Sequence, residues 1–138
     1  MGSENRQLFI VDDDISISRA LKSLMASHGF KVETFPSAET FFEEVPKTKP
    51  GCLILDVMMP GMDGWETQQR LFHTGSRRPV IFISANEDIE GKRRAALRGA
   101  VGFLQKPFDD KELVALIDRA MAKSGSDIHR PAQRRRGR

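Results

Sequence analysis

Short apolar runs, each followed by a polar or charged residue, recur along the chain and restrict the folds that it can adopt. Continuous runs occupy residues 8–11, 52–55, 79–83 and 101–104, and a weaker alternating run follows Gly29. Uninterrupted runs of this length are typical of strands that are covered on both faces of a sheet. Stretches with apolar residues at helical spacing separate the runs, and the connections are short. We therefore predict an α/β fold, in which a five-stranded parallel sheet alternates with five helices.

The expected helices are marked by residues that commonly begin or end a helix. Serine, aspartate and proline favour the start of a helix, whereas a glycine just beyond the last turn favours its end. On these signals we expect helices from Asp14 to Gly29, from Ser37 through Val45, over residues 64–72 and 89–97, and from Asp109 onward.

The composition excludes several classes of protein. A chain of 138 residues suffices for one domain, and no apolar run approaches the roughly 20 residues of a membrane span. The N-terminus carries no export signal, so we expect a cytoplasmic location. With a single cysteine and only three histidines, neither an intramolecular disulfide nor a zinc site is expected, and Cys52 is interpreted as a core residue.

The positive charge of the chain is concentrated at its C-terminal end. Residues 124–138 contain five arginines and one aspartate, so the net charge of +3 leaves the remainder close to neutral. We predict a folded domain over residues 7–123 and a basic, disordered tail or linker over residues 124–138. Nucleic-acid binding is expected only if the complete protein has a separate DNA-binding domain, apart from weak contacts of the tail.

The polar residues that follow the expected strands form one group. It comprises Asp12 and Asp13 after the first strand, Asp56 after the third, Ser84 after the fourth and Lys106 after the fifth. The carboxyl ends of parallel strands meet at one edge of a sheet, and ligands bind there where the strand order reverses. Each residue alone has an ordinary explanation as a helix cap, a turn residue or a surface lysine. Their joint occurrence in this order indicates a site, whereas the neighbouring Asp14 is best explained as a helix N-cap.

The chemistry of this group favours a metal-dependent reaction with phosphate. Clustered carboxylates repel one another, so a cation must compensate, and an all-oxygen ligand set favours Mg²⁺ or Mn²⁺. A carboxylate beside such an ion can attack phosphorus and form an aspartyl phosphate. Lys106 and the hydroxyl of Ser84 would then stabilise the phosphate oxygens.

Four segments, FIVDDD, LDVMMPGMDG, VIFISA and FLQKPF, together resemble the receiver domain of bacterial response regulators. The resemblance covers about residues 7–122, with the motifs in the family's order and spacing. It implies a flavodoxin-like, doubly wound (βα)5 fold. By similarity the phosphoacceptor is Asp56, and the metal ligands are the carboxylates of Asp12, Asp13 and Asp56 with the backbone carbonyl of Met58.

The resemblance also assigns roles to the later motifs. Ser84 and Lys106 match the hydroxyl and the lysine that contact the phosphate, and the bond between Lys106 and Pro107 matches one that is usually cis in the family. Ser84 stands where threonine is commoner. Phe103 stands where many members carry a tyrosine, so any switching at this position must depend on packing.

The function implied is that of a two-component phosphorelay receiver, a signalling protein rather than a turnover enzyme. A sensor histidine kinase or a phosphotransfer protein would supply the phosphoryl group from a phosphohistidine. A downstream output domain or protein would dock on the face formed by the fourth helix, the fifth strand and the fifth helix. A phosphorylation-dependent homodimer is a further expected assembly, and no membrane partner is expected.

Two other functions are compatible with the same fold. A phosphatase of the haloacid-dehalogenase type also uses an aspartate nucleophile and Mg²⁺, but Met58 occupies the position of its second acid and leaves no general acid for turnover. A flavin-binding protein would need a phosphate-binding loop after the first strand, where Asp12 and Asp13 would repel the phosphate. The sequence therefore favours the receiver.

Overall fold

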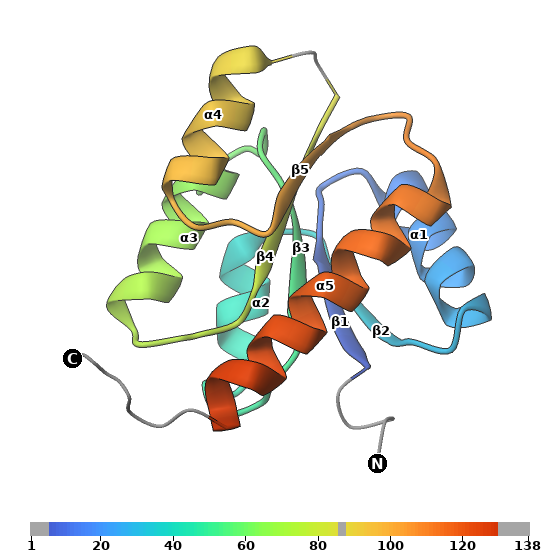
Figure 1. Ribbon diagram of the computed structural model, residues 1–138. Helices are drawn as coiled ribbons and strands as arrows, with labels where there is room; N and C mark the ends of the chain where they lie inside the picture. The colour runs from blue at the N-terminus through green and yellow to red at the C-terminus, as the bar shows by residue number, and fades with distance from the viewer. Residues whose placement is uncertain (1–5, 86–87, 130–138) are drawn as a thin grey trace.

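The structure is a computed structural model and describes residues 6–85 and 88–129 of the 138-residue chain. Within these residues five strands alternate with five helices (Figure 1). The strands are β1 (Gln7–Val11), β2 (Lys31–Phe35), β3 (Cys52–Asp56), β4 (Val80–Ser84) and β5 (Gly102–Gln105). The helices are α1 (Ile15–Ser27), α2 (Ala38–Glu44), α3 (Gly64–His73), α4 (Ile89–Leu97) and α5 (Asp110–His129).

All strands of the sheet run parallel, in the order β2-β1-β3-β4-β5. The chain therefore moves to one side from β1 to β2 and then returns to build the other side from β3. The strand order reverses between β1 and β3, where Val11 lies opposite Leu55. The α/β fold class predicted from the sequence is confirmed, and the reversal places a ligand-binding edge at the carboxyl ends of these two strands.

Two apolar cores cover the two faces of the sheet, because successive strand residues point to opposite faces. Phe9, Leu55 and Phe82 pack with residues of α2, α3 and α4 on one face. Ile10 and Ile54 pack with residues of α1 and α5 on the other face (Figure 1). Cys52 belongs to this second core as expected, and its burial raises the pKa of its thiol to about 12. Burial on both faces explains why the strand segments lack polar interruptions.

The helix starts follow the capping residues that the sequence indicates. The side chain of Asp14 accepts hydrogen bonds from the backbone N–H groups of Ser16 and Ile17, and Ser37 caps α2 in the same way. Asp63 forms a capping box with Glu66 at the start of α3. The observed boundaries differ from the predicted ones by one or two residues, except at the end of α5.

The last helix continues past the predicted boundary of the folded domain at residue 123. Its described part reaches His129. The first part of the expected tail is therefore helical, and residues 130–138 lie outside the described part of the chain. None of the helices in the described ranges combines the length and the hydropathy that spanning a membrane requires.

Candidate functional site

The residues singled out at the strand ends meet at the carboxyl edge of the sheet. Asp12 and Asp13 directly follow β1, Asp56 is the last residue of β3 and Ser84 is the last residue of β4. Lys106 follows β5, and its backbone N–H donates a hydrogen bond to the Ser84 carbonyl at 2.7 Å. The register of the strands sets Asp56 opposite Ile83, next to Ser84. The parallel sheet thus joins segments that lie far apart in the sequence.

Three carboxylates form the centre of this site. Asp12, Asp13 and Asp56 each offer one carboxylate oxygen, and these oxygens lie within 4.8 Å of one another. Asp12 is 1% exposed and Asp56 is 5% exposed, whereas Asp13 faces solvent. Two buried carboxylates and an exposed one make a cluster that is open on one side. Such a cluster could hold a metal ion, because hard divalent cations prefer carboxylate oxygens and retain water ligands.

Local hydrogen bonds hold Asp12 in place. Its carboxylate accepts the backbone N–H of Asp14 at 2.9 Å, and its carbonyl accepts the hydroxyl of Ser18 at 3.4 Å. Ser18 is buried in α1, whose N-cap is Asp14. The first turn of α1 therefore fixes the backbone that carries Asp12. The role of Ser18 was not predicted, and a serine on the buried face of an amphipathic helix is the sequence signal that could have revealed it.

Lys106 brings positive charge to the carboxylates. Its ammonium group lies 3.0 Å from Oδ2 of Asp12 and 3.6 Å from Oδ1 of Asp56, and its side chain is 14% exposed. The peptide bond between Lys106 and Pro107 is cis, as the family resemblance implied. One ammonium group faces three carboxylates, so the site keeps excess negative charge. This excess is the electrostatic reason to expect a cation in the cluster.

The pKa of Asp56 reflects the same excess of negative charge. Burial and the neighbouring charge of Asp12 raise the pKa of Asp56 from 3.8 to about 6, and the ammonium of Lys106 offsets only part of this rise. The ionised form of Asp56 is thus destabilised where the carboxylate is most enclosed. A divalent cation would relieve the repulsion and favour the ionised, nucleophilic form.

The loop after β3 approaches the site closely through Gly64. A Cβ atom at this position would lie 2.6 Å from the carbonyl oxygen of Asp56 and 2.9 Å from Cα of Val57. The backbone N–H of Gly64 donates to the Val57 carbonyl at 2.9 Å. Only glycine allows the start of α3 to pack this closely on the backbone that carries Asp56. This residue was also not predicted, although glycine is an unfavourable first helical residue and signals a close approach.

Ser84 and Phe103 occupy neighbouring strands beside the carboxylates. Ser84 is 2% exposed at the end of β4, and Phe103 on β5 lies opposite Phe82 in the strand register. The ring of Phe103 is partly buried and packs against the core of the α2, α3 and α4 face. Met58, expected as a backbone ligand, is 65% exposed in the loop that follows Asp56.

Comparison with known proteins decides the family. A family model described as the response regulator receiver domain matches residues 8–118. The chain belongs to the response-regulator receiver family. Receiver domains of this family act in two-component signal transduction, and the matches give no support to the phosphatase alternative.

The receiver matches part of longer regulators in sequence. The response regulator protein TodT of Pseudomonas putida is 44% identical over 114 residues, which cover 83% of this chain and 50% of TodT. The transcriptional regulatory protein FixJ of Bradyrhizobium diazoefficiens is 35% identical over 117 residues, which cover 85% of this chain and 57% of FixJ. The aligned receiver thus spans about half the length of these curated relatives.

Solved structures confirm the receiver fold. The response regulator StyR superposes with a TM-score of 0.83 at 40% identity, and the match covers 89% of this chain and 62% of StyR. The crystal structure of FixJ-N gives a TM-score of 0.78 at 33% identity and covers 84% of this chain and 93% of that chain. The flavodoxin-like (βα)5 architecture implied by the sequence motifs is therefore confirmed.

Proposed function

We propose that Asp56 accepts a phosphoryl group from a phosphohistidine of a sensor histidine kinase or a phosphotransfer protein. The observation that carries this proposal is the meeting of Asp56 with two further carboxylates and the ammonium of Lys106 at the edge of the sheet. During transfer, a carboxylate oxygen of Asp56 bonds to phosphorus while the bond between phosphorus and the histidine nitrogen breaks. The released imidazole nitrogen then takes up a proton.

Asp12, Asp13 and Asp56 would hold Mg²⁺ or Mn²⁺, together with the backbone carbonyl of Met58. The chemistry of the donor set fits such an ion, because every donor is an oxygen and most are charged. When bound, the ion supplies positive charge that lowers the repulsion between the carboxylates and an incoming phosphoryl group. The hydrogen bond from the Asp14 N–H keeps Asp12 oriented for this role.

Lys106 and Ser84 would stabilise the phosphorylated form. The Lys106 ammonium lies within 3.6 Å of Asp56, so a small side-chain movement brings it to a phosphate oxygen. The hydroxyl of Ser84 sits at the end of the adjacent strand and donates to another oxygen. As this hydroxyl moves toward the phosphate, the partly buried ring of Phe103 fills the space that it leaves.

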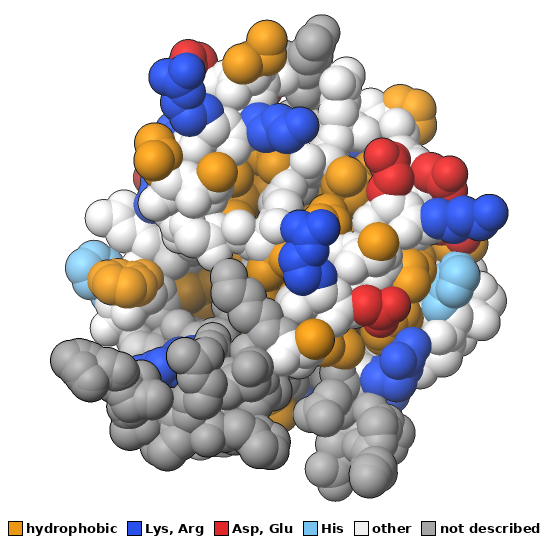
Figure 2. All heavy atoms as spheres, viewed as in Figure 1, with side chains coloured by type: hydrophobic (Ala, Val, Ile, Leu, Met, Phe, Trp, Pro, Cys, Tyr) orange, Lys and Arg blue, Asp and Glu red, His pale blue; other side chains and the backbone are white. Residues whose placement is uncertain are grey.

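The domain transmits a signal rather than turning over a substrate. The position two residues after Asp56 carries Met58, which offers no general acid or base to release the phosphoryl group. Phosphorylation changes the face formed by α4, β5 and α5. In α4, Ile89 and Leu97 are 74% and 80% exposed, and hydrophobic side chains reach the surface over this helix (Figure 2).

The partners follow from this arrangement. An output domain or protein, or a second phosphorylated copy of this chain, docks on the face of α4, β5 and α5. The receiver domain begins at residue 7 and extends through residue 123, with α5 continuing to His129, and it works in the cytoplasm. Residues 124–138 are dispensable for phosphorylation, and DNA binding, if the complete protein has it, resides in a separate domain.

Intact-protein mass spectrometry tests the phosphoacceptor. With acetyl phosphate and Mg²⁺ the chain should gain one phosphoryl group, and Asp56→Asn should gain none. Asp14→Asn is the matched control, because asparagine also caps helices and Asp14 lies outside the carboxylate cluster. Equal labelling of the Asp56→Asn protein would refute the assignment, as would a gain that does not require a divalent cation.

NMR spectroscopy tests the coupling through Ser84. Ser84→Ala removes the hydroxyl at nearly constant volume, so the protein should still be phosphorylated but show smaller shift changes at Phe103 and in α4. Full shift changes in this variant would contradict the coupling.

A second variant separates the role of Lys106 from that of the metal ligands. Lys106→Ala should retain Mg²⁺ binding, but its phosphorylated form should show a reduced conformational response.

A further inference from the structure

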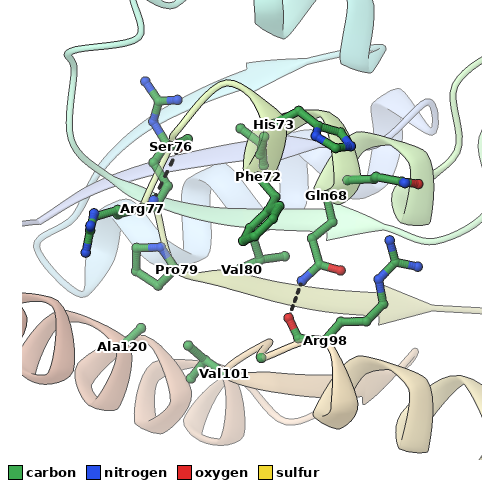
Figure 3. A pocket seen from close by; sticks show the side chains of 14 residues that line it. Gln68, Phe72, His73, Ser76, Arg77, Pro79, Val80, Arg98, Val101 and Ala120 are labelled. Atoms are coloured by element: carbon green, nitrogen blue, oxygen red, sulfur yellow. Dashed lines mark hydrogen bonds between the residues drawn. The ribbon is translucent and has the colours of Figure 1, made fainter. Parts of the chain in front are cut away.

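A groove lies at the amino end of the sheet, opposite the edge that carries the carboxylates. Its volume is about 500 Å³, and its walls come from the end of α3, the start of β4, the turn between α4 and β5, and α5 (Figure 3). Pro79 and Val80 line it at the beginning of β4, whereas Ser84 ends the same strand at the carboxylate site. An occupant of the groove would therefore not touch Asp56.

The floor of the groove is apolar. Val80, Val101 and Ala120 contribute aliphatic surface from β4, the segment before β5, and α5. Phe72, in the last turn of α3, is 79% exposed, and Figure 3 shows its ring between Gln68 and the segment from Ser76 to Pro79. A single exposed aromatic ring is common on protein surfaces. A ring that lines a hollow with further apolar walls is instead a suitable contact for a partner.

The polar part of the groove is cationic. Arg77, Arg98 and His73 line it, and none of the described lining residues is acidic. The position of Arg98 at the C-cap of α4 is explained by the helix dipole, and its guanidinium donates to the Trp65 carbonyl at 3.3 Å. Arg77 is exposed in the segment after α3, and among the described residues no carboxylate lies within 4.0 Å of it. This charge suits an acidic partner.

An unsatisfied acceptor belongs to Gln68, one of the residues that line the groove. The side-chain nitrogen of Gln68 donates to the Arg98 carbonyl at 3.2 Å, as Figure 3 shows. Because that carbonyl can only accept, the orientation of the Gln68 amide is fixed, and its Oε1 must point the other way. This oxygen is buried and has no hydrogen-bond partner among the described residues. Because this oxygen is buried, Gln68 contributes to the groove only through the exposed part of its side chain.

We propose that this groove docks the N-terminal turn of an acidic amphipathic helix from a partner protein. The first turn of a helix favours acidic side chains, which suit the guanidinium groups of Arg77 and Arg98 at the groove. The ends of α3 and α4 lie at the groove and present their carbonyl ends to the partner's positive helix terminus. An apolar side chain of the partner helix packs against Phe72.

The charge of the groove excludes the chain's own tail as the occupant. Residues 130–138 contain five arginines and no acidic residue, so they would be repelled by Arg77 and Arg98. A nucleic-acid backbone would match the arginines, but it would leave the apolar floor exposed and would place anions at two helix C-termini. A helical, acidic protein segment matches both the positive charge and the apolar floor of the groove.

NMR titration of the complete 138-residue chain tests the proposal. The probe is a synthetic helical peptide with a serine N-cap, glutamates in its first turn and leucines along one face. It should shift the resonances of Gln68, Phe72 and Val101, and both Phe72→Ala and Arg77→Glu should weaken binding about tenfold. The matched control is Arg19→Glu, which makes the same charge change at an exposed residue of α1 and should leave the affinity unchanged.

Three results would overturn the proposal. The first is equal binding of a scrambled peptide with the same composition but no apolar face, which would show that only general electrostatic attraction is present. A single-stranded oligonucleotide that binds with no dependence on Phe72 would show a surface for anions rather than for a protein helix. Equal weakening by Arg19→Glu would place the contact elsewhere. Unchanged thermal unfolding midpoints would confirm that the variants fold. None of these measurements involves Asp56, so their outcome does not depend on the test of phosphorylation.

Discussion

The central strands and the β5–α4 edge of this receiver are packed in different ways. Every residue of β1, β3 and β4 is buried, whereas no residue of β5 is. Helix α4, which lies beside β5, buries only Gly91 and Ala95. Gly102 allows β5 to approach α5, because a Cβ atom there would lie 2.6 Å from the Leu116 side chain. The central strands are therefore fully buried in the core, whereas β5 at the edge of the sheet is only partly buried.

This difference separates two requirements of the proposed function. Asp12, Asp56 and Ser84 extend from the densely packed strands, where burial from both faces fixes their positions. Lys106 and Phe103 belong to the β5 segment, where fewer buried contacts oppose a local rearrangement. Chemistry at the carboxylates needs a fixed geometry, and transmission of a signal needs a segment that changes at low cost. The fold supplies both in neighbouring strands.

The largest expected effect compares a leucine in each region. Leu55→Ala removes a fully buried side chain from β3 and should reduce the free energy of unfolding by about 3–4 kcal/mol. Leu104→Ala, at a partly buried position in β5, should cost only about 1 kcal/mol. Urea unfolding followed by circular dichroism measures both. Equal losses would show that β5 is as firmly packed as the central strands.

The second effect concerns the charge buried in the central region. The folded-state pKa of Asp56 is about 6, above its ordinary 3.8, so the metal-free fold loses stability as the pH rises through this range. Asp56→Asn removes the destabilised charge and should stabilise the metal-free protein at pH 7 by about 1–2 kcal/mol, after allowance for solvent screening.

Denaturation at pH 4 and pH 7, with and without Mg²⁺, measures this effect. The difference between the native protein and Asp56→Asn should be much smaller at pH 4, where Asp56 is protonated in the folded state and only partly ionised in the unfolded state. Saturating Mg²⁺ should stabilise the native protein more than the variant. Identical stabilities at pH 7 without Mg²⁺ would argue that Asp56 is not under electrostatic strain.

The third effect tests whether α4 opens independently of the core. Asp88 caps α4 by accepting the N–H of Gly91 at 2.8 Å, so Asp88→Ala should remove about 1 kcal/mol from the stability of α4. Hydrogen exchange should accelerate in α4 but not in β3. Asp63→Ala, which removes the cap of α3, is the control and should destabilise the region around Trp65 instead. Equal acceleration in β3 and α4 after Asp88→Ala would mean that the two regions open as one unit.

The smallest effect concerns a surface contact between α1 and α5, which lies outside both regions and serves as a reference for them. His28, just after α1, lies 3.0 Å from the carboxylate of Asp110 at the start of α5. The hydrogen bond from His28 is the main cause of the lowered pKa of Asp110, so His28→Ala should raise that pKa toward its ordinary value. The contact stabilises the fold above the unfolded-state pKa of Asp110 and is lost as the pH falls through the folded-state value. Carboxyl NMR titration measures this, and an unchanged midpoint would contradict the assignment.

The sequence by itself determined the order of the elements and the composition of the candidate site. The interior of a strand that is buried on both faces is mostly apolar, so the polar residues after Val11, Leu55 and Ile83 mark the strand ends. Parallel strands then brought Asp12, Asp56 and Ser84 to one edge without any knowledge of distances. The helix caps were also predictable, because a cap depends on residues within one turn of the helix.

Only the tertiary structure decided how strongly these residues interact. Lys106 contacts Asp12 across 94 positions of the sequence, and the pKa of Asp56 depends on this contact and on burial from several segments. The close approach of Gly64 and the groove around Phe72 likewise arise where separate segments pack together. Sequence patterns record what each segment needs locally. Distances, burial and charge balance depend on the register of the strands and the packing of helices against them, which no single segment encodes.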